Sequence, residues 1–228
     1  MSKQKSSRLK DFFIRLLILL VGLTIAHLGV TLFLLTELGS DPYNVLIQGL
    51  FRTFKVLVPI SLTHGTTHVI FSFILIAVLI LADKHYIKTG TLVCMFFGGP
   101  IIDLFSTLLG PLHMSEAFFP LRIAILSLGC VILAFGMTIV INSEAGTGPN
   151  DLVAIVISDK TGKPFSIIRI LVDTGFVLSG FLLGGVFGIG TLVCVLLVGP
   201  VAGYFLPITK KMTRKLTSGS NLTSSQVL

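Results

Sequence analysis

The chain has 228 residues, of which 53% are hydrophobic and 12% are charged, and its mean hydropathy is +0.98. Soluble domains carry roughly a quarter charged residues, so this chain lacks the polar surface that a water-facing core needs. About 20 residues cross a bilayer as a helix, so the length allows six or seven crossings and leaves no room for a soluble catalytic domain. These numbers exclude nucleic-acid enzymes, Rossmann and P-loop domains, and secreted disulfide scaffolds.

The positive charge lies at the ends of the chain. Lys plus Arg number 17 against 10 Asp plus Glu, which gives a net charge of +7 at pH 7. Basic residues gather around the start of the first apolar run and after the last, as is typical of cytoplasmic segments beside anionic lipid. The three cysteines, Cys94, Cys130 and Cys194, lie inside apolar runs without metal-ligand spacing, so we expect them to be packing residues.

Six apolar runs are long enough to cross a bilayer. They predict helices at residues 14–35, 61–82, 89–110, 121–142, 165–185 and 189–208. The distribution of Lys and Arg over the loops predicts that both termini are cytoplasmic. The predicted parts of the chain are a basic N-terminus (1–13), a first membrane unit (14–110), an external linker (111–120), a second membrane unit (121–208) and a tail (209–228) that is basic, then polar and disordered.

Self-comparison reveals an internal repeat. The segment TELGSDPYN at 36–44 matches SEAGTGPND at 143–151, Arg15 matches Arg122, and GTLVC at 90–94 recurs at 190–194. Each unit has three spans, an odd number, so the second enters the bilayer from the opposite side, as in many secondary transporters. The predicted fold is an all-α membrane protein with six transmembrane helices as two inverted three-helix repeats, each with a short re-entrant or interfacial half-helix after its first span.

The repeated motif resembles that of the YczE/YitT-type integral membrane proteins of bacteria. In this sequence the motif consists of Glu37, Gly39, Asp41, Pro42 and Asn44, and then of Glu144, Gly146, Gly148, Pro149 and Asp151. The likeness is closer to the YczE-like branch, because YitT-type proteins carry an added cytoplasmic domain. The resemblance implies a multi-pass protein of the bacterial plasma membrane and implies no particular substrate.

The prolines of the motif predict the start of a short helix in each half, because proline suits a first helical turn. Helix N-termini present free amides that can hold an anion, whereas the neighbouring carboxylates can instead hold a proton, a sodium ion or a cationic group. A third interpretation is that the polar side chains only cap the helices. The candidate substrate or ion site comprises Glu37, Gly39, Ser40, Asp41, Pro42, Asn44, Asp103, Glu144, Gly146, Thr147, Pro149, Asn150 and Asp151.

Asp103 belongs to this set for a different reason. Pro100 and Pro200, each preceded by glycine, are expected to kink or break the third span of each half. Asp103 lies one turn beyond Pro100 at membrane depth, where an ionisable group is costly and faces protein or water. Its repeat counterpart is Gly203, so Asp103 is expected to mark a functional asymmetry between the halves or else to be a paired structural acid.

The second span of each half carries a polar pair. His64 and His68 lie four residues apart, and Arg169 and Asp173 hold the matching positions. A histidine pair can respond to protons, but two ligands on one span make no metal site. Arg169 and Asp173 are expected to form an ion pair within one helix. The alternative for all four residues is polar packing between the halves.

No GxSxG, HExxH or Walker motif is present, so the sequence predicts neither an enzyme nor a cofactor. The main hypothesis is a secondary transporter or permease for a small solute, with a site at the midplane between the repeats. The alternative is a non-transporting accessory or scaffold for another membrane or biosynthetic system. The expected partners are the lipid bilayer, a small molecule or ion, and a second copy or another membrane protein, with no nucleic acid.

Overall fold

The computed structural model describes residues 2–57 and 64–222, and every regular element in these ranges is a helix. The α-helices are α1 (Ser2–Leu35), α2 (Pro42–Leu57), α3 (His64–Asp83), α4 (Thr89–Leu109), α5 (Phe119–Asn142), α6 (Pro149–Thr161), α7 (Phe165–Leu182) and α8 (Ile189–Leu222). Three short 3₁₀ helices, η1 (Lys84–Tyr86), η2 (Gly110–Leu112) and η3 (Met114–Glu116), lie in the connections on either side of α4. The all-helical prediction is confirmed within these ranges.

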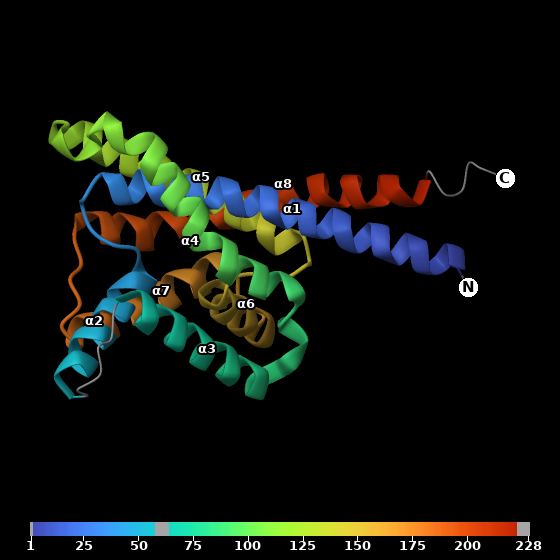
Figure 1. Ribbon diagram of the computed structural model, residues 1–228, viewed down its shortest axis with the longest axis horizontal. Helices are drawn as coiled ribbons and strands as arrows, with labels where there is room; N and C mark the ends of the chain where they lie inside the picture. Colours follow the sequence, from blue (N-terminus) through green and yellow to red (C-terminus); the bar gives the residue numbers. More distant parts are fainter. Residues whose placement is uncertain (1, 58–63, 223–228) are drawn as a thin grey trace.

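The helices form two groups. Figure 1 shows α1, α5 and α8 running along the long axis, with the start of α1 and the end of α8 at the same end of the molecule. In this first group α1 packs against α5 and α4, and α5 packs against α8. In the second group α2 packs on α7, and α6 contacts both α3 and α7. The two groups are joined chiefly where α7 packs on α8.

Five helices in the described part of the chain are long and apolar enough to cross a bilayer. The qualifying stretches are Leu9–Leu35, Thr89–Leu112, Phe119–Asn142, Phe165–Leu182 and Ile189–Thr217. α3 has 20 residues, but the apolar stretch in its described part, Thr67–Leu81, is shorter. The chain is therefore a multi-pass membrane protein with five candidate spans among its described residues, where the sequence predicts six.

The two terminal helices extend further than the apolar runs predict. α1 already begins at Ser2, and α8 continues to Leu222, so residues 209–222 are helical where a disordered tail is predicted. Lys and Arg, which are frequent in both extensions, are good helix formers. In α8 the hydroxyls of Thr209, Thr213 and Thr217 also donate to carbonyl oxygens one turn earlier. The helix can therefore continue after its apolar run ends.

Glycines allow α1 and α5 to approach each other closely. A Cβ atom added to Gly29 would lie 2.3 Å from the amide nitrogen of Leu133, and one added to Gly136 would lie 2.3 Å from that of Ala26. Small residues are the usual means of packing helices in lipid, where there is no hydrophobic driving force between helices. The three cysteines are buried and unbonded, as the sequence predicts for packing residues.

The loop that follows the first helix of each half contacts the other half. The amide of Gly90, at the start of α4, donates to the carbonyl oxygen of Ala145 at 2.8 Å. The amide of Gly190, at the start of α8, donates to the carbonyl oxygen of Leu38 at 2.9 Å. Gly90 matches Gly190 in the repeat, and Leu38 matches Ala145. Each motif loop is thus anchored on the GTLVC segment of the opposite half by the same hydrogen bond.

The motif loops share an unusual backbone conformation. Glu37 and Glu144 have φ values of 52° and 57°, and Gly39 and Gly146 have φ values of 150° and 135°. A Cβ atom at Gly146 would also lie 2.5 Å from the amide nitrogen of Thr91, and Gly39 lies similarly close to α8. Both the left-handed conformation and the lack of space therefore require glycine at these two positions.

Gly29→Val is expected to destabilise the fold, because its added atoms meet backbone that cannot move aside. Overpacking costs about 1–3 kcal/mol in soluble cores. Gly175→Ala in α7 is the matched control, since no atom lies within 4 Å of the added Cβ and alanine favours the helix. Thermal unfolding in detergent should show a lower midpoint for Gly29→Val alone. Equal midpoints for both variants would contradict the close contact between α1 and α5.

Candidate functional site

A buried charged network joins the short helix α6 to α7. Nε of Arg169 donates to Oδ2 of Asp173, one turn along α7, at 2.8 Å. Nη1 of Arg169 donates to Oδ1 of Asp151, in the first turn of α6, at 2.5 Å. Arg169 is 7% exposed and Asp173 is 1% exposed. The ion pair that the sequence predicts within α7 is present, and Asp151 is a second partner of the same arginine.

This network has more negative than positive charge. Two carboxylates share one guanidinium, and Oδ1 of Asp173 is buried without a hydrogen-bond partner in the described part of the chain. Burying charges costs free energy unless each is paired and hydrogen-bonded. Ionisable groups inside membrane segments usually mark a site of function for the same reason. The unpartnered oxygen makes this region the leading candidate site.

Asp41 approaches the same region from the first half. Its carboxylate caps α2 by accepting from the amide of Asn44 at 3.2 Å and from the side-chain nitrogen of Asn44 at 2.5 Å. Asp41 also lies close enough to Asp173, and to His27 of α1, to act on both electrostatically. Both short helices begin at the motif proline, as predicted. The two motifs therefore direct acidic groups toward one buried region from opposite halves.

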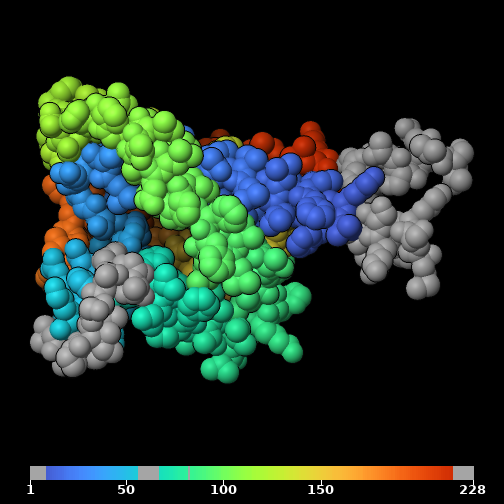
Figure 2. Space-filling view, in the orientation of Figure 1, coloured from blue at the N-terminus to red at the C-terminus, as the bar shows by residue number. Residues whose placement is uncertain are grey.

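Three acids of the predicted site lie elsewhere. Glu37 and Glu144 are exposed in the two motif loops, and Asp103 is exposed on α4. Figure 2 shows α4, in green, crossing the front face of the molecule without a helix over it. The helix contacts of α4 are mainly with α1, so most of its surface, including Asp103, is uncovered. Of the five acids in the candidate set, only Asp41 and Asp151 approach the buried network.

Two arginines that the candidate set omits hold the motif loops. Arg15 of α1 forms an ion pair with Glu144, and this hydrogen bond is the main reason that the pKa of Glu144 lies below its usual value. Arg122 of α5 donates through Nε at 3.0 Å and Nη2 at 2.6 Å to the carbonyl oxygen of Thr36. The match of Arg15 with Arg122 in the repeat is the sequence signal that could have identified both.

The histidine pair of α3 is only partly described. The side chain of His64 lies outside the described residues. The ring of His68 meets the ring of Tyr43 edge-on with centroids 5.3 Å apart, and the hydroxyl of Tyr43 lies 3.0 Å from that of Ser72. Among the described residues there is no group of three side chains that could hold a metal ion. His68 therefore contributes polar packing between α2 and α3.

Hydrogen bonds join α2 to the connection between α7 and α8. Gln48 Oε1 accepts from a backbone amide of this connection at 2.7 Å. Arg52 and Thr53 donate to two of its carbonyl oxygens at 2.6 and 3.1 Å. These three hydrogen bonds hold residues 183–186 against α2.

The second half has a cleft at the corresponding position, between α6 and the connection from α3 to α4. Its volume is about 320 Å³. Its polar lining includes Tyr86, Lys88, Glu144, Thr147 and Asp159. At matching positions, three hydrogen bonds hold one connection against α2, and the other connection borders a cleft beside α6.

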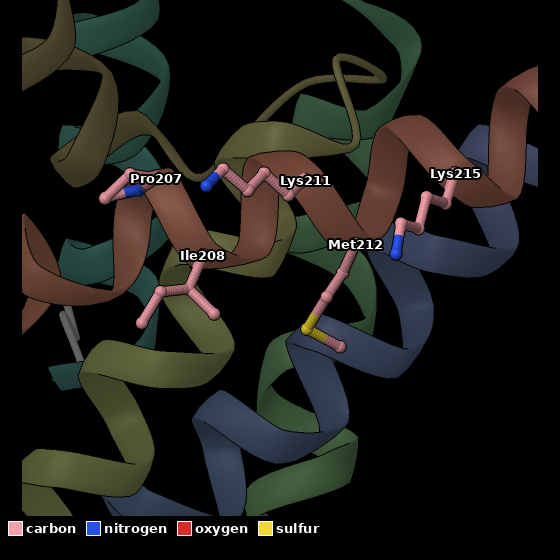
Figure 3. Close-up of a pocket in the computed structure, with 5 residues that line it drawn as sticks. All are labelled: Pro207, Ile208, Lys211, Met212 and Lys215. Atoms are coloured by element: carbon pink, nitrogen blue, oxygen red, sulfur yellow. The ribbon is translucent and has the colours of Figure 1, made fainter.

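Another cavity, of about 350 Å³, lies along α8 and is lined by Pro207, Ile208, Lys211, Met212 and Lys215 (Figure 3). Among the described residues, one helix supplies this whole lining, so the cavity is a groove on the surface of α8. Lysines beside apolar side chains suit contact with anionic lipid at the edge of a membrane. We assign the groove to the lipid-facing surface.

Residues 13–207 match a family of unknown function, DUF6198. The membrane protein YczE of Bacillus subtilis (strain 168), described as uncharacterized, is 27% identical over 187 residues, which are 82% of this chain and 82% of YczE. YyaS of the same organism is 28% identical over 84% of this chain and 92% of its own length. A protein of Haemophilus influenzae is 28% identical over 86% of this chain and 84% of its own length. No solved structure matches the chain. The resemblance to YczE-like proteins is confirmed.

Arg169→Met is expected to destabilise the protein strongly, because it leaves the buried carboxylate of Asp173 and the partly buried one of Asp151 without their cation. Breaking a buried ion pair from one side costs about 3–5 kcal/mol. Adding Asp151→Asn and Asp173→Asn to Arg169→Met should restore most of this loss, and Arg214→Met on the exposed part of α8 is the matched control. Denaturant unfolding in detergent measures the differences. The network would lose its assigned importance if Arg169→Met were no less stable than Arg214→Met.

Proposed function

Since the chain belongs to the family of unknown function DUF6198, we propose that it is a secondary transporter or permease for a small solute. The single observation that carries this proposal is the buried network of Arg169, Asp151 and Asp173. Three ionisable groups in membrane helices are costly for a protein that is only a structural bundle. Their position where the short helix α6 meets α7 is typical of solute sites in transporters, which use the ends of discontinuous helices.

The proposed architecture is two inverted repeats with six spans. α3, with 20 residues, is the sixth span, since about 20 helical residues match the hydrocarbon thickness. Three findings support the inversion: the matched hydrogen bonds of Gly90 and Gly190, the matched left-handed residues, and the two terminal helix ends at one end of the molecule. With both termini cytoplasmic by the positive-inside rule, the Glu37 loop faces outward and the Glu144 loop faces the cytoplasm.

The difference between the halves supports a particular state of the transport cycle. In this topology, the contact sealed by Gln48, Arg52 and Thr53 lies on the outer side, and the cleft beside α6 lies on the cytoplasmic side. Inverted repeats that exchange conformations open one side while they close the other. We therefore describe this state as open to the cytoplasm, and we expect the cleft to close by similar contacts in the opposite state.

Flux in proteoliposomes tests the function. The native protein is expected to carry at least one member of a panel of small anionic, cationic and neutral solutes faster than protein-free liposomes, as measured by mass spectrometry of the vesicle contents. Asp173→Asn should slow this flux by about tenfold or more, the effect of a loss of roughly 1.4 kcal/mol in transition-state stabilisation. Asp173→Asn keeps the shape of the side chain while removing its charge.

Glu116→Gln is the matched control, because Glu116 is exposed in η3 and forms no ion pair within the described chain. It should retain native flux, and size-exclusion profiles should be the same for all three proteins. Native flux at the level of protein-free liposomes across the panel would contradict transport and favour an accessory role. Equal loss of flux in Asp173→Asn and Glu116→Gln would remove the network from the transport site.

A further inference from the structure

The N-termini of the two short helices differ at one position of the motif. In the first half the carboxylate of Asp41 accepts from the amide of Asn44 and thereby caps α2. Gly148 holds the matching position in the second half, and α6 has no side-chain cap. The amide of Asp151, which matches that of Asn44, has no acceptor within the described part of the chain. α6 therefore lacks a carboxylate at the capping position where α2 has Asp41, and the one acid in its first turn, Asp151, is paired with Arg169.

Two buried hydroxyls beside this helix end also lack partners. Beside α2 the hydroxyl of Thr191 donates to the carbonyl oxygen of Ser40 at 2.6 Å. The matching residues beside α6 are Thr91 and Thr147, which are 0% and 3% exposed. Neither hydroxyl oxygen has a hydrogen-bond partner among the described residues. Leaving a buried hydroxyl unpaired costs free energy that a bound polar group would recover.

Thr147 and Gly146 line the cleft of about 320 Å³ beside α6 directly. Of the two acids that line the cleft, Glu144 is paired with Arg15. The ammonium group of Lys88 bonds only to the carbonyl oxygen of Glu144 and forms no ion pair within the described chain. A helix N-terminus, a lysine and two hydroxyls are donors, and together they favour an anionic ligand.

We propose that the cleft binds the carboxylate or phosphate group of the transported solute at the N-terminus of α6. The bound group would occupy the position that the carboxylate of Asp41 occupies at the N-terminus of α2. The solute class is therefore small organic or inorganic anions. This assignment deepens the proposed function and rests on it, but the binding step is measured without flux. An anionic lipid headgroup has the same chemistry and is separated from a free solute by the design of the experiment.

Thermal unfolding of the full-length protein in neutral detergent tests the site. Sodium acetate and sodium phosphate are the probes, and sodium chloride at equal ionic strength is the reference. At a concentration about 100-fold above Kd, at least one probe should raise the unfolding midpoint by roughly 5–10 °C. Thr147→Val, which removes one hydroxyl at nearly constant volume, should weaken the response by about tenfold.

Gly148→Asp supplies the missing carboxylate within the chain. A Cβ atom at Gly148 meets only Oδ1 of Asn150, at 3.0 Å, so the variant fits with a small shift of one side chain. It should raise the midpoint without added anion and abolish the response to both probes. Gly110→Asp is the matched control, since an added Cβ there meets nothing within 4 Å, and it should keep the native response.

Three outcomes would overturn the proposal. The first is a native midpoint that acetate, phosphate and chloride affect equally. The second is a full anion response in Gly148→Asp. The third is a higher unfolding midpoint in vesicles that contain phosphatidylglycerol than in vesicles of phosphatidylcholine alone, with no response to free acetate or phosphate. If Gly148→Asp also abolished this effect of phosphatidylglycerol, the bound anion would be a lipid headgroup. Anion binding without flux would reject transport and retain the site.

Discussion

The hydrogen bonds from Gly90 to Ala145 and from Gly190 to Leu38 fix how the two halves of this protein meet. Each bond joins the start of the last helix of one half to the motif loop of the other, so neither half can form its contacts alone. Their formation needs a left-handed loop and a backbone approach too close for a Cβ atom, which explains why the motif carries glycine at Gly39 and Gly146. The short helices start immediately after these loops, and their N-termini are therefore positioned by the opposite half.

The charges follow from this arrangement. Each motif loop is bonded to an arginine and to the start of a helix of the other half. An acidic residue follows each loop, Asp41 as the cap of α2 and Asp151 in the first turn of α6. Arg169 offsets only part of that negative charge. The region around the start of α6 lacks a carboxylate at Gly148, leaves the hydroxyls of Thr91 and Thr147 without partners among the described residues, and borders the cleft. The two repeated units thus differ where a solute would bind, and the proposed anion supplies the carboxylate that the start of α6 lacks at Gly148.

Much of the fold can be predicted from the sequence, because apolar runs and the motif prolines define most helix ends in a membrane. The extension of α8 to Leu222 could not be predicted from hydropathy, since its basic residues are good helix formers without apolar character. Asp151, Arg169 and Asp173 were identifiable as charges at membrane depth. That they form one network depends on how α6 packs on α7, and the exposure of Asp103 depends on which face of α4 meets α1. The spacing of residues along the chain predicts neither this helix packing nor the exposure of Asp103. The match of Arg15 with Arg122, in contrast, could be predicted from the repeat.

The proposed inverted repeat requires that the two matching motif loops lie on opposite sides of the membrane. The most direct measurement is labelling of Glu37→Cys and Glu144→Cys, each in a background without the three native cysteines, with a maleimide that cannot cross membranes. Both glutamates are exposed, so each cysteine should react when the reagent is on its side. In right-side-out vesicles only Glu37→Cys should be labelled, and in inverted vesicles only Glu144→Cys. Labelling of both positions from the same side would contradict the inverted repeat and the alternating openings derived from it.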